Sequence, residues 1–365
     1  MRVTLNALHR IYATGEHAAF TDLCHWRSSY YVAFRRAYSH GIVPAGSISL
    51  ARWDGTRRHA PRWESCGEIA LPCGDCRDPK FYATPEALFL VCGVYLPMPQ
   101  GTGSPSVLRP VATENVLITH TTFTTDGLHW GPLLPVLRPN YWGWSCLSIS
   151  NAFLMASYHV GTPGEVSSSI ALWSGQSPRL VGAYGTIYDG ASHTTEGRQY
   201  RYAQSIPSEP VLYQPIPGML ACCLRTENTM EIGVSRAPYQ DDWRWWDTGM
   251  LIHPSAMLRT RQGWLLAGRA LSPIAPSSPG QRRDARAHLP LRYETTTALW
   301  HVEGQYVEPL LTLPSGGDTG YAGLCAGTRR GEYLVSFYSQ HAYAQGPTQT
   351  TLPSADVFVA TVRLD

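Results

Sequence analysis

A unit of roughly 50 to 60 residues recurs six times along the chain. Each unit has a short strand pattern, then an apolar strand, then a third strand rich in Ser, Ile and Val that often ends in a polar turn with tryptophan. In the first unit these segments read AFTDLCHW, YYVAFRRA and SISLARWDG. Apolar residues that alternate over about four to eight positions between turn residues are typical of antiparallel strands. Six units of four strands predict an all-β fold, a six-bladed β-propeller that takes up residues 1–365 as a single domain.

The last unit supplies only three strand patterns before the chain ends at Asp365. The opening segment RVTLNALHRIY alternates in the same way. We therefore expect this N-terminal segment to form the fourth strand of the last blade and to close the ring, so that both termini lie in one blade.

The composition agrees with a fold of many short strands joined by turns. The chain has 33 Gly and 28 Pro, and charged residues make up 15% of it, against roughly 25% in average soluble domains. The 44% hydrophobic fraction excludes a disordered chain. The shortage of Lys, Glu and Ala runs excludes a coiled coil or a helical solenoid.

The charge pattern limits the possible partners. A net charge of +2 and scattered arginines disfavour nucleic acid. No apolar run approaches the ~18 residues of a membrane helix, and the first residues lack the apolar core and cleavage site of a signal peptide. We expect no membrane partner and a cytoplasmic location, or a secreted one if a signal has been removed.

The nine cysteines do not predict a metal centre. Only Cys73-Gly-Asp-Cys76 has the spacing of a ligand pair, and a zinc site would need a second pair or matching histidines. Cysteines in segments such as LACCLR are typical of buried thiols, which pack as small apolar groups. We therefore expect neither a metal nor a cofactor.

One turn has a known structural pattern. The segment from Thr124 to Trp130 reads TTDGLHW and is close to the Asp box, Ser/Thr-x-Asp-x-Gly-x-x-Trp. In that turn the aspartate accepts hydrogen bonds from backbone amides and the tryptophan packs between strands. We expect Asp126 and Trp130 between the third and fourth strands of the second blade, on the rim and far from any active site.

Two long segments lack a strand pattern. Residues 185–203 contain TIYDGASHTTEGRQYRY, and residues 272–287 contain APSSPGQRRDAR. Loops of this length are uncommon in a compact fold and are usually functional or disordered. We interpret the first as a loop that lines the site and the second as a mobile surface loop.

The site is expected at the centre of the ring. In a propeller the first strand of every blade lines the central funnel, and the loops entering these strands form the floor of the pocket. Candidates on the first strands are His17, Asp22, Arg77, Asp78, Lys80, Trp142, Trp144, Glu209, Asp318 and Tyr321. Candidates at the ends of the second strands are Arg35, His40, Arg225, Arg269 and His341.

These candidates have structural alternatives. Asp78 and Glu209 each precede a proline and could cap a turn, and Tyr321 could be one more core aromatic among 20 tyrosines. Lys80 is the single lysine among 29 basic residues. Because an ammonium is a compact point charge and a guanidinium is a planar fork, an arginine could not simply replace it. Lys80 is either a functional group beside Asp78 or a chance remnant.

Three segments carry a family resemblance. Ser208-Glu209-Pro210, Gly218-Met219-Leu220 and Leu224-Arg225 resemble the Glu–turn–Arg pattern of the sialidase (exo-neuraminidase) superfamily. The segment from Gly317 to Leu324, GDTGYAGL, resembles the sialidase segment that carries the nucleophilic tyrosine in the last blade. HAAFTDL, YYVAFR, RDPKF and LVSFYSQH resemble bacterial sialidase-like propellers with BNR repeats. The resemblance covers nearly the whole chain, with short motifs.

The resemblance implies a glycosidase acting on a terminal acidic or uncommon sugar. Tyr321 would attack the anomeric carbon with Glu209 accepting its proton, and Arg225 and Arg269 would bind a substrate carboxylate bidentately. A tyrosine has a pKa near 10 and needs such a base. Asp78 or Asp22 would protonate the leaving group.

One position departs from the sialidase pattern. Sialidases carry the first arginine of a carboxylate-binding triad in an Arg-Ile-Pro motif, and the matching segment here, residues 18–22, reads AAFTD. Either Arg35 or Arg36 takes its place, or the substrate is not a standard sialic acid. Arg292 competes with Arg269 for the third arginine.

Two other function classes remain open. A polysaccharide lyase could neutralise a uronate carboxylate while Tyr or His removes the α-proton, with groups from His17, His40, His193, Tyr188 and Arg198. A glycan-binding propeller without catalysis is the other.

Overall fold

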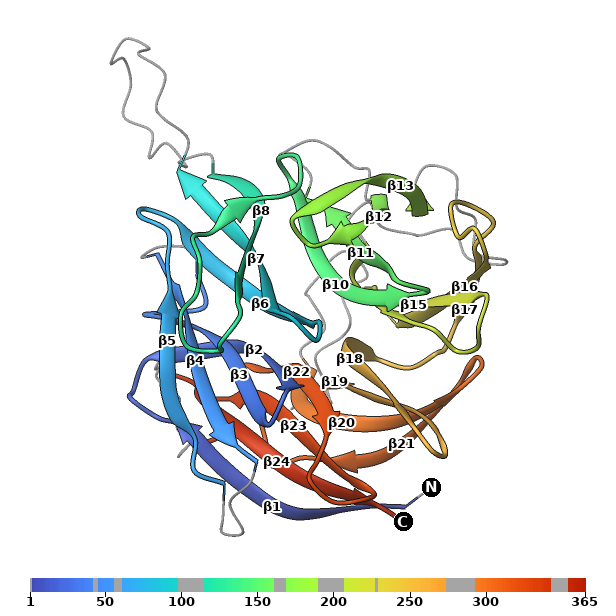
Figure 1. Ribbon diagram of the computed structural model, residues 1–365. Coiled ribbons are helices and arrows are strands. Elements are labelled where there is room, and N and C mark those ends of the chain that lie inside the picture. The colour runs from blue at the N-terminus through green and yellow to red at the C-terminus, as the bar shows by residue number, and fades with distance from the viewer. Residues whose placement is uncertain are drawn as a thin grey trace, which may run out of the picture.

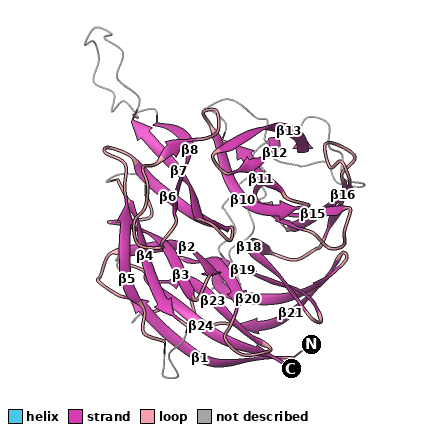
Figure 2. Cartoon of the chain, in the orientation of Figure 1, coloured by secondary structure: helices cyan, strands magenta, loops and turns pink. Residues whose placement is uncertain are grey.

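The computed structural model describes residues 2–41, 45–55, 61–97, 115–160, 169–189, 207–226, 229–273, 293–342 and 354–365. Within them the fold is all-β and consists of six four-stranded sheets arranged in a ring (Figures 1 and 2). The predicted six-bladed β-propeller is confirmed. These residues contain no helix, and so none long and apolar enough to span a membrane.

The strands of the first three blades follow in chain order. The first blade consists of β2 (His17–Trp26), β3 (Ser29–Ala37), β4 (Ser47–Asp54) and β5 (Glu64–Ile69). The second consists of β6 (Asp75–Ala83), β7 (Leu88–Pro97), β8 (Asn115–Thr124) and β9 (Leu134–Pro135). The third consists of β10 (Tyr141–Ile149), β11 (Ala152–His159), β12 (Ser169–Ser177) and β13 (Leu180–Asp189).

The remaining blades complete the ring. The fourth consists of β14 (Ser208–Tyr213), β15 (Met219–Arg225), β16 (Met230–Arg236) and β17 (Arg244–Asp247). The fifth consists of β18 (Ile252–Thr260), β19 (Gly263–Pro273), β20 (Tyr293–Glu303) and β21 (Tyr306–Thr312). The sixth consists of β22 (Thr319–Ala326), β23 (Glu332–Ser339), β24 (Asp356–Leu364) and the N-terminal β1 (Val3–Tyr12).

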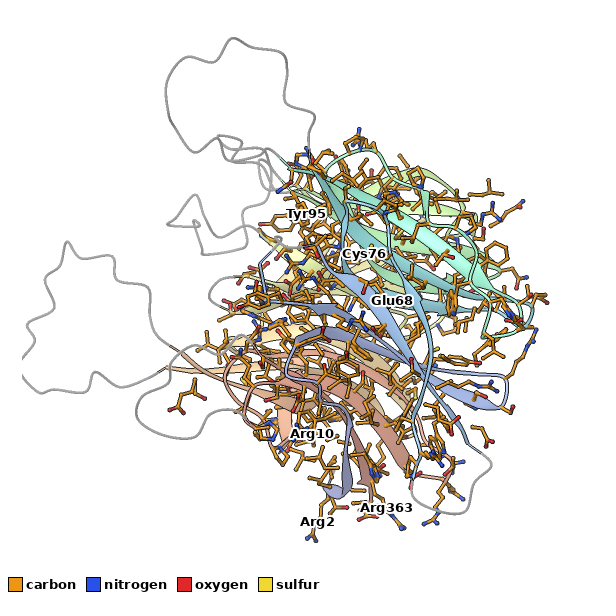
Figure 3. The ribbon with its side chains drawn as sticks, turned by 90° about the vertical axis from the view of Figure 1, so that its left-hand side faces the viewer. Arg2, Arg10, Glu68, Cys76, Tyr95 and Arg363 are labelled. Atoms are coloured by element: carbon orange, nitrogen blue, oxygen red, sulfur yellow. The ribbon has the colours of Figure 1, made fainter. Side chains whose placement is uncertain are left out.

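The N-terminal strand closes the ring as expected. β1 pairs antiparallel with β24 from Val3 opposite Leu364 to Tyr12 opposite Val357. The two termini therefore lie side by side in one blade (Figure 1). In the side view of Figure 3, Arg2 and Arg363 of this blade and Tyr95 of the second blade lie at opposite ends of the molecule.

The core is divided among the spaces between blades. One buried cluster joins β3 and β4 of the first blade to β7 of the second, another joins β15 of the fourth to β19 and β20 of the fifth, and the other interfaces are filled in the same way. The alternation that predicted the strands also explains this packing, because each inner strand of a blade has both faces covered. The first strands of neighbouring blades contact one another around the centre of the ring.

The turn after β8 is held by hydrogen bonds to Asp126. The Asp126 carboxylate accepts the backbone N–H groups of Leu128 and His129, both at 2.8 Å. These hydrogen bonds hold the pKa of Asp126 below its usual range. The Trp130 ring packs against the first and second blades beside Phe81.

The two long segments are only partly described. The first was expected to be without strands from residue 185, but β13 continues to Asp189, and the rest of it lies outside the described residues. The second begins inside β19, which ends at Pro273, and its remainder is also outside them.

Candidate active site

Each first strand carries a β-bulge near its pocket end. The register slips once in every one of the six first strands where it pairs with the second strand. The bulges begin at Phe20, Asp78, Trp144, Glu209, Ser255 and Tyr321. A bulge adds one residue to a strand and re-aims a side chain, and all of these residues except Ser255 line the central pocket.

Four of the bulged residues have a left-handed backbone. Phe20, Asp78, Glu209 and Tyr321 have φ angles of 58°, 49°, 54° and 44°. Non-glycine residues seldom adopt this region, and such conformations cluster at functional sites. Their side chains meet in one pocket of about 230 Å³. The pocket is lined by Phe20, His40, Arg77, Asp78, Tyr95, Trp142, Trp144, Tyr158, Glu209 and Tyr321.

Tyr321, Glu209 and Arg225 form a hydrogen-bonded group in this pocket. The Tyr321 hydroxyl donates to Glu209 Oε1 at 2.7 Å, and Arg225 Nη1 donates to the same oxygen at 2.5 Å. Arg225 Nη1 also lies 3.2 Å from the Tyr321 hydroxyl. The three residues come from β14, β15 and β22, on the fourth and sixth blades, so only the closed ring brings them together.

The electrostatics of the group favour a neutral tyrosine with a base beside it. Burial raises the pKa of Tyr321, and the Glu209 carboxylate raises it further, against the opposing effect of Arg225 and Arg269. The Glu209 charge raises the pKa of Arg225 despite its burial. Tyr321 therefore needs an acceptor for its proton in order to attack anything, and Glu209 is hydrogen-bonded to it already.

Asp78 is the second carboxyl group of the pocket. Its side chain is 5% exposed, and Arg77 Nε lies 3.9 Å from its Oδ2. Burial raises its pKa to about 6, although Arg77 and Lys80 oppose the shift. A carboxylic acid with this pKa holds its proton in part of the molecules near neutral pH and can act as an acid or a hydrogen-bond donor.

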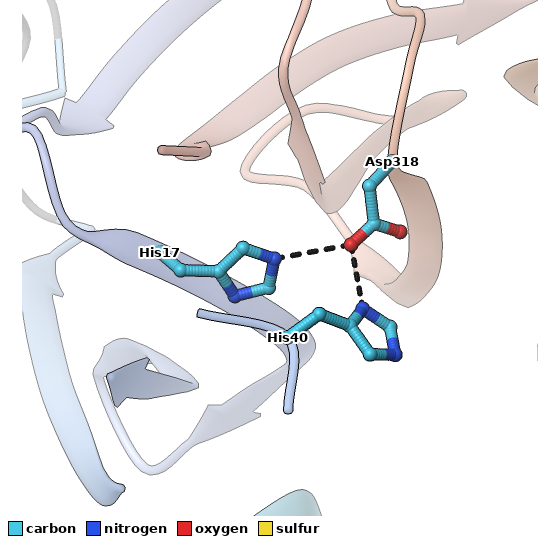
Figure 4. A group of neighbouring side chains, drawn as sticks. All are labelled: His17, His40 and Asp318. Atoms are coloured by element: carbon cyan, nitrogen blue, oxygen red, sulfur yellow. Dashed lines mark hydrogen bonds and ion pairs between the residues drawn. The ribbon is translucent and has the colours of Figure 1, made fainter. Parts of the chain in front are cut away.

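Asp318 forms a second polar cluster at the edge of the pocket. Its Oδ2 lies 3.0 Å from His17 Nε2 and 2.6 Å from His40 Nδ1 (Figure 4). Its Oδ1 accepts the Tyr338 hydroxyl at 2.6 Å and Arg269 Nη2 at 3.3 Å. Burial alone would raise the pKa of Asp318, but the hydrogen bonds from His17 and His40 hold it below its usual range. Burial lowers the pKa of His17.

This cluster is better described by hydrogen bonds than by metal ligation. His17, His40 and Asp318 offer three possible ligand atoms within 4.8 Å of one another. However, both Asp318 oxygens already accept hydrogen bonds, one of them from Arg269. His17 Nδ1 is buried with no hydrogen-bond partner among the described residues, whereas metal-bound histidines almost always donate through the other nitrogen.

Asp22 and Lys80 lie outside the residues that line the pocket. Each is two positions beyond a bulged residue, Phe20 or Asp78. Asp22 Oδ2 accepts the Phe81 N–H at 2.7 Å, and burial raises its pKa while Lys80 lowers it. Lys80 Nζ lies 4.9 Å from the centre of the Trp144 ring. The charge of Lys80 therefore acts on Asp22 outside the pocket lining.

The arginines of the first blade are engaged by protein groups. Arg35 is fully buried, and its guanidinium donates to Asp75 Oδ1 at 2.8 Å and to the carbonyls of Ser39 and Gly41 at 2.7 Å. Arg36 points to the surface and pairs with Glu68 at 3.1 Å. Neither lines the pocket, and the segment that lacks the sialidase arginine places Phe20 there instead.

The other sequence candidates are dispersed. Arg269 lies behind Tyr321, with its guanidinium carbon 5.2 Å from that ring. His341 Nδ1 lies 2.8 Å from Ser339 Oγ, outside the pocket lining. Tyr188 is on β13, where it packs against Trp245. His193, Arg198 and Arg292 lie outside the described residues.

The sequence did not lead us to three aromatic side chains that line the pocket. Phe20, Tyr95 and Tyr158 line it beside the tryptophans that were named. Tyr95 and Tyr158 lie near the ends of β7 and β11, the second strands of their blades, and Tyr338 lies near the end of β23. An aromatic residue close to the end of an apolar second strand was the available signal.

The comparisons with known proteins agree on the fold. No family model and no curated protein matches the sequence. Among solved structures, the Hadza microbial sialidase Hz136 is similar with a TM-score of 0.60 and 12% identity over 94% of this chain and 65% of that one. Trypanosoma rangeli sialidase in complex with the inhibitor DANA has a TM-score of 0.59 and 10% identity over 99% of this chain and 58% of that one.

A third similar structure is that of Penicillium chrysogenum α-L-arabinanase complexed with arabinobiose. Its TM-score is 0.59 at 10% identity, and 98% of each chain is covered. The chain thus spans less than two thirds of the length of the two sialidases but nearly all of the arabinanase. The protein shares the six-bladed propeller fold of sialidases, the fold that its sequence resemblance implied.

Proposed function

We propose that this protein is a glycoside hydrolase that works through a covalent glycosyl–tyrosine intermediate. The observation that carries the proposal is the 2.7 Å hydrogen bond from the Tyr321 hydroxyl to Glu209 inside a pocket that also contains Asp78. A tyrosine, its base and a proton-bearing acid in one pocket are the parts that a retaining glycosidase of this kind needs.

In the first step Tyr321 Oη bonds to the anomeric carbon while its proton passes to Glu209. The raised pKa of Tyr321 means that attack without this transfer is unfavourable. Arg225, at 2.5 Å from Glu209 and 3.2 Å from the Tyr321 hydroxyl, stabilises the negative charge wherever it lies in the pair. In the second step water replaces the tyrosine and Glu209 returns the proton.

The leaving oxygen needs a proton from a second group. Besides the Tyr321–Glu209 pair, the pocket lining contains two side chains of the types that serve as general acids, Asp78 and His40. Asp22, the other acid predicted from the sequence, does not line the pocket, and its Oδ2 accepts the Phe81 N–H.

The pocket supports a single terminal sugar as the bound unit. Its volume of about 230 Å³ is below the roughly 300–1,000 Å³ of pockets for drug-sized ligands. Six Phe, Tyr and Trp side chains line it, which suits the apolar faces of a sugar ring. Because Phe20 stands where sialidases carry an arginine, we propose an acidic or uncommon sugar other than a standard sialic acid.

The similar structures lend support through what their titles name. They include sialidases, an α-L-arabinanase bound to arabinobiose and an α-L-arabinofuranosidase bound to an iminosugar inhibitor. All are named as enzymes that act on glycans, with both acidic and neutral sugars represented.

The test is a screen of aryl glycosides that includes sialic acid, related nonulosonates, uronates and arabinofuranosides. We expect hydrolysis of one class, with the first-formed product anomer retained by NMR. A 2- or 3-fluorinated glycosyl fluoride of the active class should add its glycosyl mass to the peptide containing Tyr321.

Four results would contradict the proposal. Inverted product would exclude a covalent intermediate, and label on another residue would exclude Tyr321 as nucleophile. An unsaturated product absorbing in the ultraviolet would indicate the polysaccharide lyase instead. Binding without turnover on every glycan would indicate a non-catalytic propeller.

A further inference from the structure

His40 and Asp78 lie at different depths of the same pocket. Both line it. The His40 side chain is 53% exposed, whereas the Asp78 side chain is 5% exposed. His40 follows β3, in the loop before β4, and so stands at the mouth. Asp78 is a bulged residue of β6 and lies on the floor.

The hydrogen bond to Asp318 fixes which nitrogen of His40 can meet a ligand. Nδ1 lies 2.6 Å from Asp318 Oδ2, so it carries a proton and donates to the carboxylate (Figure 4). Nε2 is then the nitrogen left for proton exchange. A carboxylate that holds one ring nitrogen sets the tautomer and orientation of the other and stabilises the imidazolium.

Asp318 is itself held from several directions. Tyr338 and Arg269 donate to its Oδ1 at 2.6 and 3.3 Å, and His17 shares its Oδ2. The Asp318 backbone N–H donates to Gln340 Oε1 at 2.8 Å. An anion fixed in this way by three blades gives the exposed imidazole a rigid partner.

We propose that His40 Nε2–H donates the proton to the leaving-group oxygen, with Asp318 as its positioning residue. This inference rests on the proposed function. A sugar ring that fills the pocket must send its leaving group out through the mouth, which is where His40 stands. The buried Asp78 then contacts hydroxyl groups of the bound sugar at the floor.

The proton and bond changes balance in two steps. As the Tyr321 Oη–carbon bond forms and the carbon–oxygen bond of the leaving group breaks, the Tyr321 proton passes to Glu209 and the His40 Nε2 proton passes to the leaving oxygen. A water molecule then attacks the same carbon and gives its proton to His40 Nε2. Tyr321 leaves with the proton held by Glu209, and the net reaction is hydrolysis.

The charged groups around His40 come from the first, second and sixth blades. Asp318 is hydrogen-bonded to Nδ1, and the His17 ring lies 5.5 Å away. Arg77 Nη2 donates to the His40 carbonyl at 3.1 Å, and Asp78 interacts electrostatically with His40. The Phe20 ring is perpendicular to the imidazole, with the ring centres 5.0 Å apart. Of these groups, Asp318 alone bonds the imidazole.

The experiment compares leaving groups in His40→Asn, Asp78→Asn and a control, His25→Asn, whose residue is exposed on the same blade. The probes are glycosides of the sugar class found active, with a dinitrophenolate or an alkyl alcohol as leaving group. A dinitrophenolate needs no proton to depart. We expect His40→Asn to lower kcat/KM about 10²- to 10⁴-fold for the alkyl glycoside and less than about tenfold for the dinitrophenyl glycoside.

Asp78→Asn should lower both rates alike, and His25→Asn should change neither. If the selective loss appears in Asp78→Asn and His40→Asn lowers both rates equally, His40 is not the proton donor, yet the glycosidase proposal stands. Absence of turnover together with absence of label on Tyr321 would overturn the proposed function, and this inference with it.

Asp318→Asn provides a second variant if His40→Asn is poorly folded. Without its hydrogen bond to Asp318 the imidazole loses its fixed orientation, so kcat/KM should fall more for the alkyl glycoside than for the dinitrophenyl glycoside. An equal fall for both leaving groups would show that Asp318 only supports the fold.

Discussion

Two neighbouring layers of residues on the central strands contain charged side chains. In one layer these side chains line the pocket, and in the other they are enclosed by adjacent strands. The pocket layer consists of the bulged residues Phe20, Asp78, Trp144, Glu209 and Tyr321. The inner layer lies two positions further along the same strands and includes Asp22, Lys80 and Cys146. Burial raises the pKa values of Asp22 and Cys146, and the charge of Lys80 lowers both.

The difference shows what a bulge does in this fold. Side chains of the pocket layer face an open volume and are hydrogen-bonded to one another: Tyr321 and Arg225, for example, both donate to Glu209. Groups of the inner layer are closed in by adjacent strands. At Gly323 of β22, an added Cβ would lie 2.2 Å from the Leu23 nitrogen. Pocket residues should therefore control activity, and inner residues should control stability.

The largest expected effect is on activity in the pocket layer. Tyr321→Phe removes the nucleophilic oxygen but keeps the ring packed against Phe20 and Trp144. We expect kcat/KM to fall by at least roughly 10³-fold with little change in the melting temperature. Tyr213→Phe, on the fourth blade and buried against Trp264, is the matched control and should leave the rate unchanged. Full hydrolytic activity of Tyr321→Phe would exclude Tyr321 as the nucleophile.

The next effect is on stability in the inner layer. Asp22→Asn keeps an acceptor for the Phe81 N–H but removes a negative charge that interacts with the Lys80 ammonium, which interacts with Asp78 as well. Exchanging a charged acceptor for a neutral one weakens a hydrogen bond by about 1 to 2 kcal/mol. The free energy of unfolding, measured in urea, should fall by that order while kcat of the folded fraction is kept. A loss of activity without a loss of stability would instead place Asp22 in the chemistry.

Asp78 belongs to the pocket layer but also affects stability, because ionising this buried carboxyl group lowers the free energy of unfolding. Its pKa of about 6 in the fold lies above the ordinary 3.8, so folding favours the protonated form. The stabilising contribution is complete below about pH 4 and is lost as pH rises through about 6. Asp78→Asn cannot lose a proton. Its unfolding free energy relative to the native chain should rise by about 2 to 3 kcal/mol between pH 4.5 and 8.

That difference is measured by urea unfolding of both proteins across the pH range. Burial also raises the pKa values of Asp22 and Asp75, but these residues are present in both proteins, so their effects cancel. A difference that does not vary with pH would mean that Asp78 is ionised in the fold at all these pH values.

The sequence predicted the blades because they depend on short-range patterns. Alternation and turn residues within each unit mark the strands, and the unpaired N-terminal pattern predicted the strand that closes the ring. The resemblance named Tyr321, Glu209 and Arg225, which the structure places in hydrogen-bond contact. The hydrogen bond between Tyr321 and Glu209 joins residues that are 112 positions apart.

The rest depended on geometry that leaves no local signal. The bulges place non-glycine residues at positive φ, so no glycine marks them. Arg35 was named for substrate, yet Asp75 and two loop carbonyls take up its guanidinium, which no spacing indicates. His17 and His40 were named separately, and their common partner Asp318 lies 301 and 278 residues away.

The smallest expected effect concerns the single lysine of the chain. Lys80 is 7% exposed, and its ammonium lies 4.9 Å from the Trp144 ring. Lys80→Arg keeps the charge but forces a larger planar group into a closed space, which costs about 1 to 3 kcal/mol. We expect the low end of that range in urea unfolding, with kcat/KM within about threefold, because Lys80 does not line the pocket. A variant as stable as the native chain would show that the inner layer needs only a cation there, and that the lysine is a chance remnant. A large loss of activity would instead show that the ammonium sets the position of Trp144, and so joins the two layers.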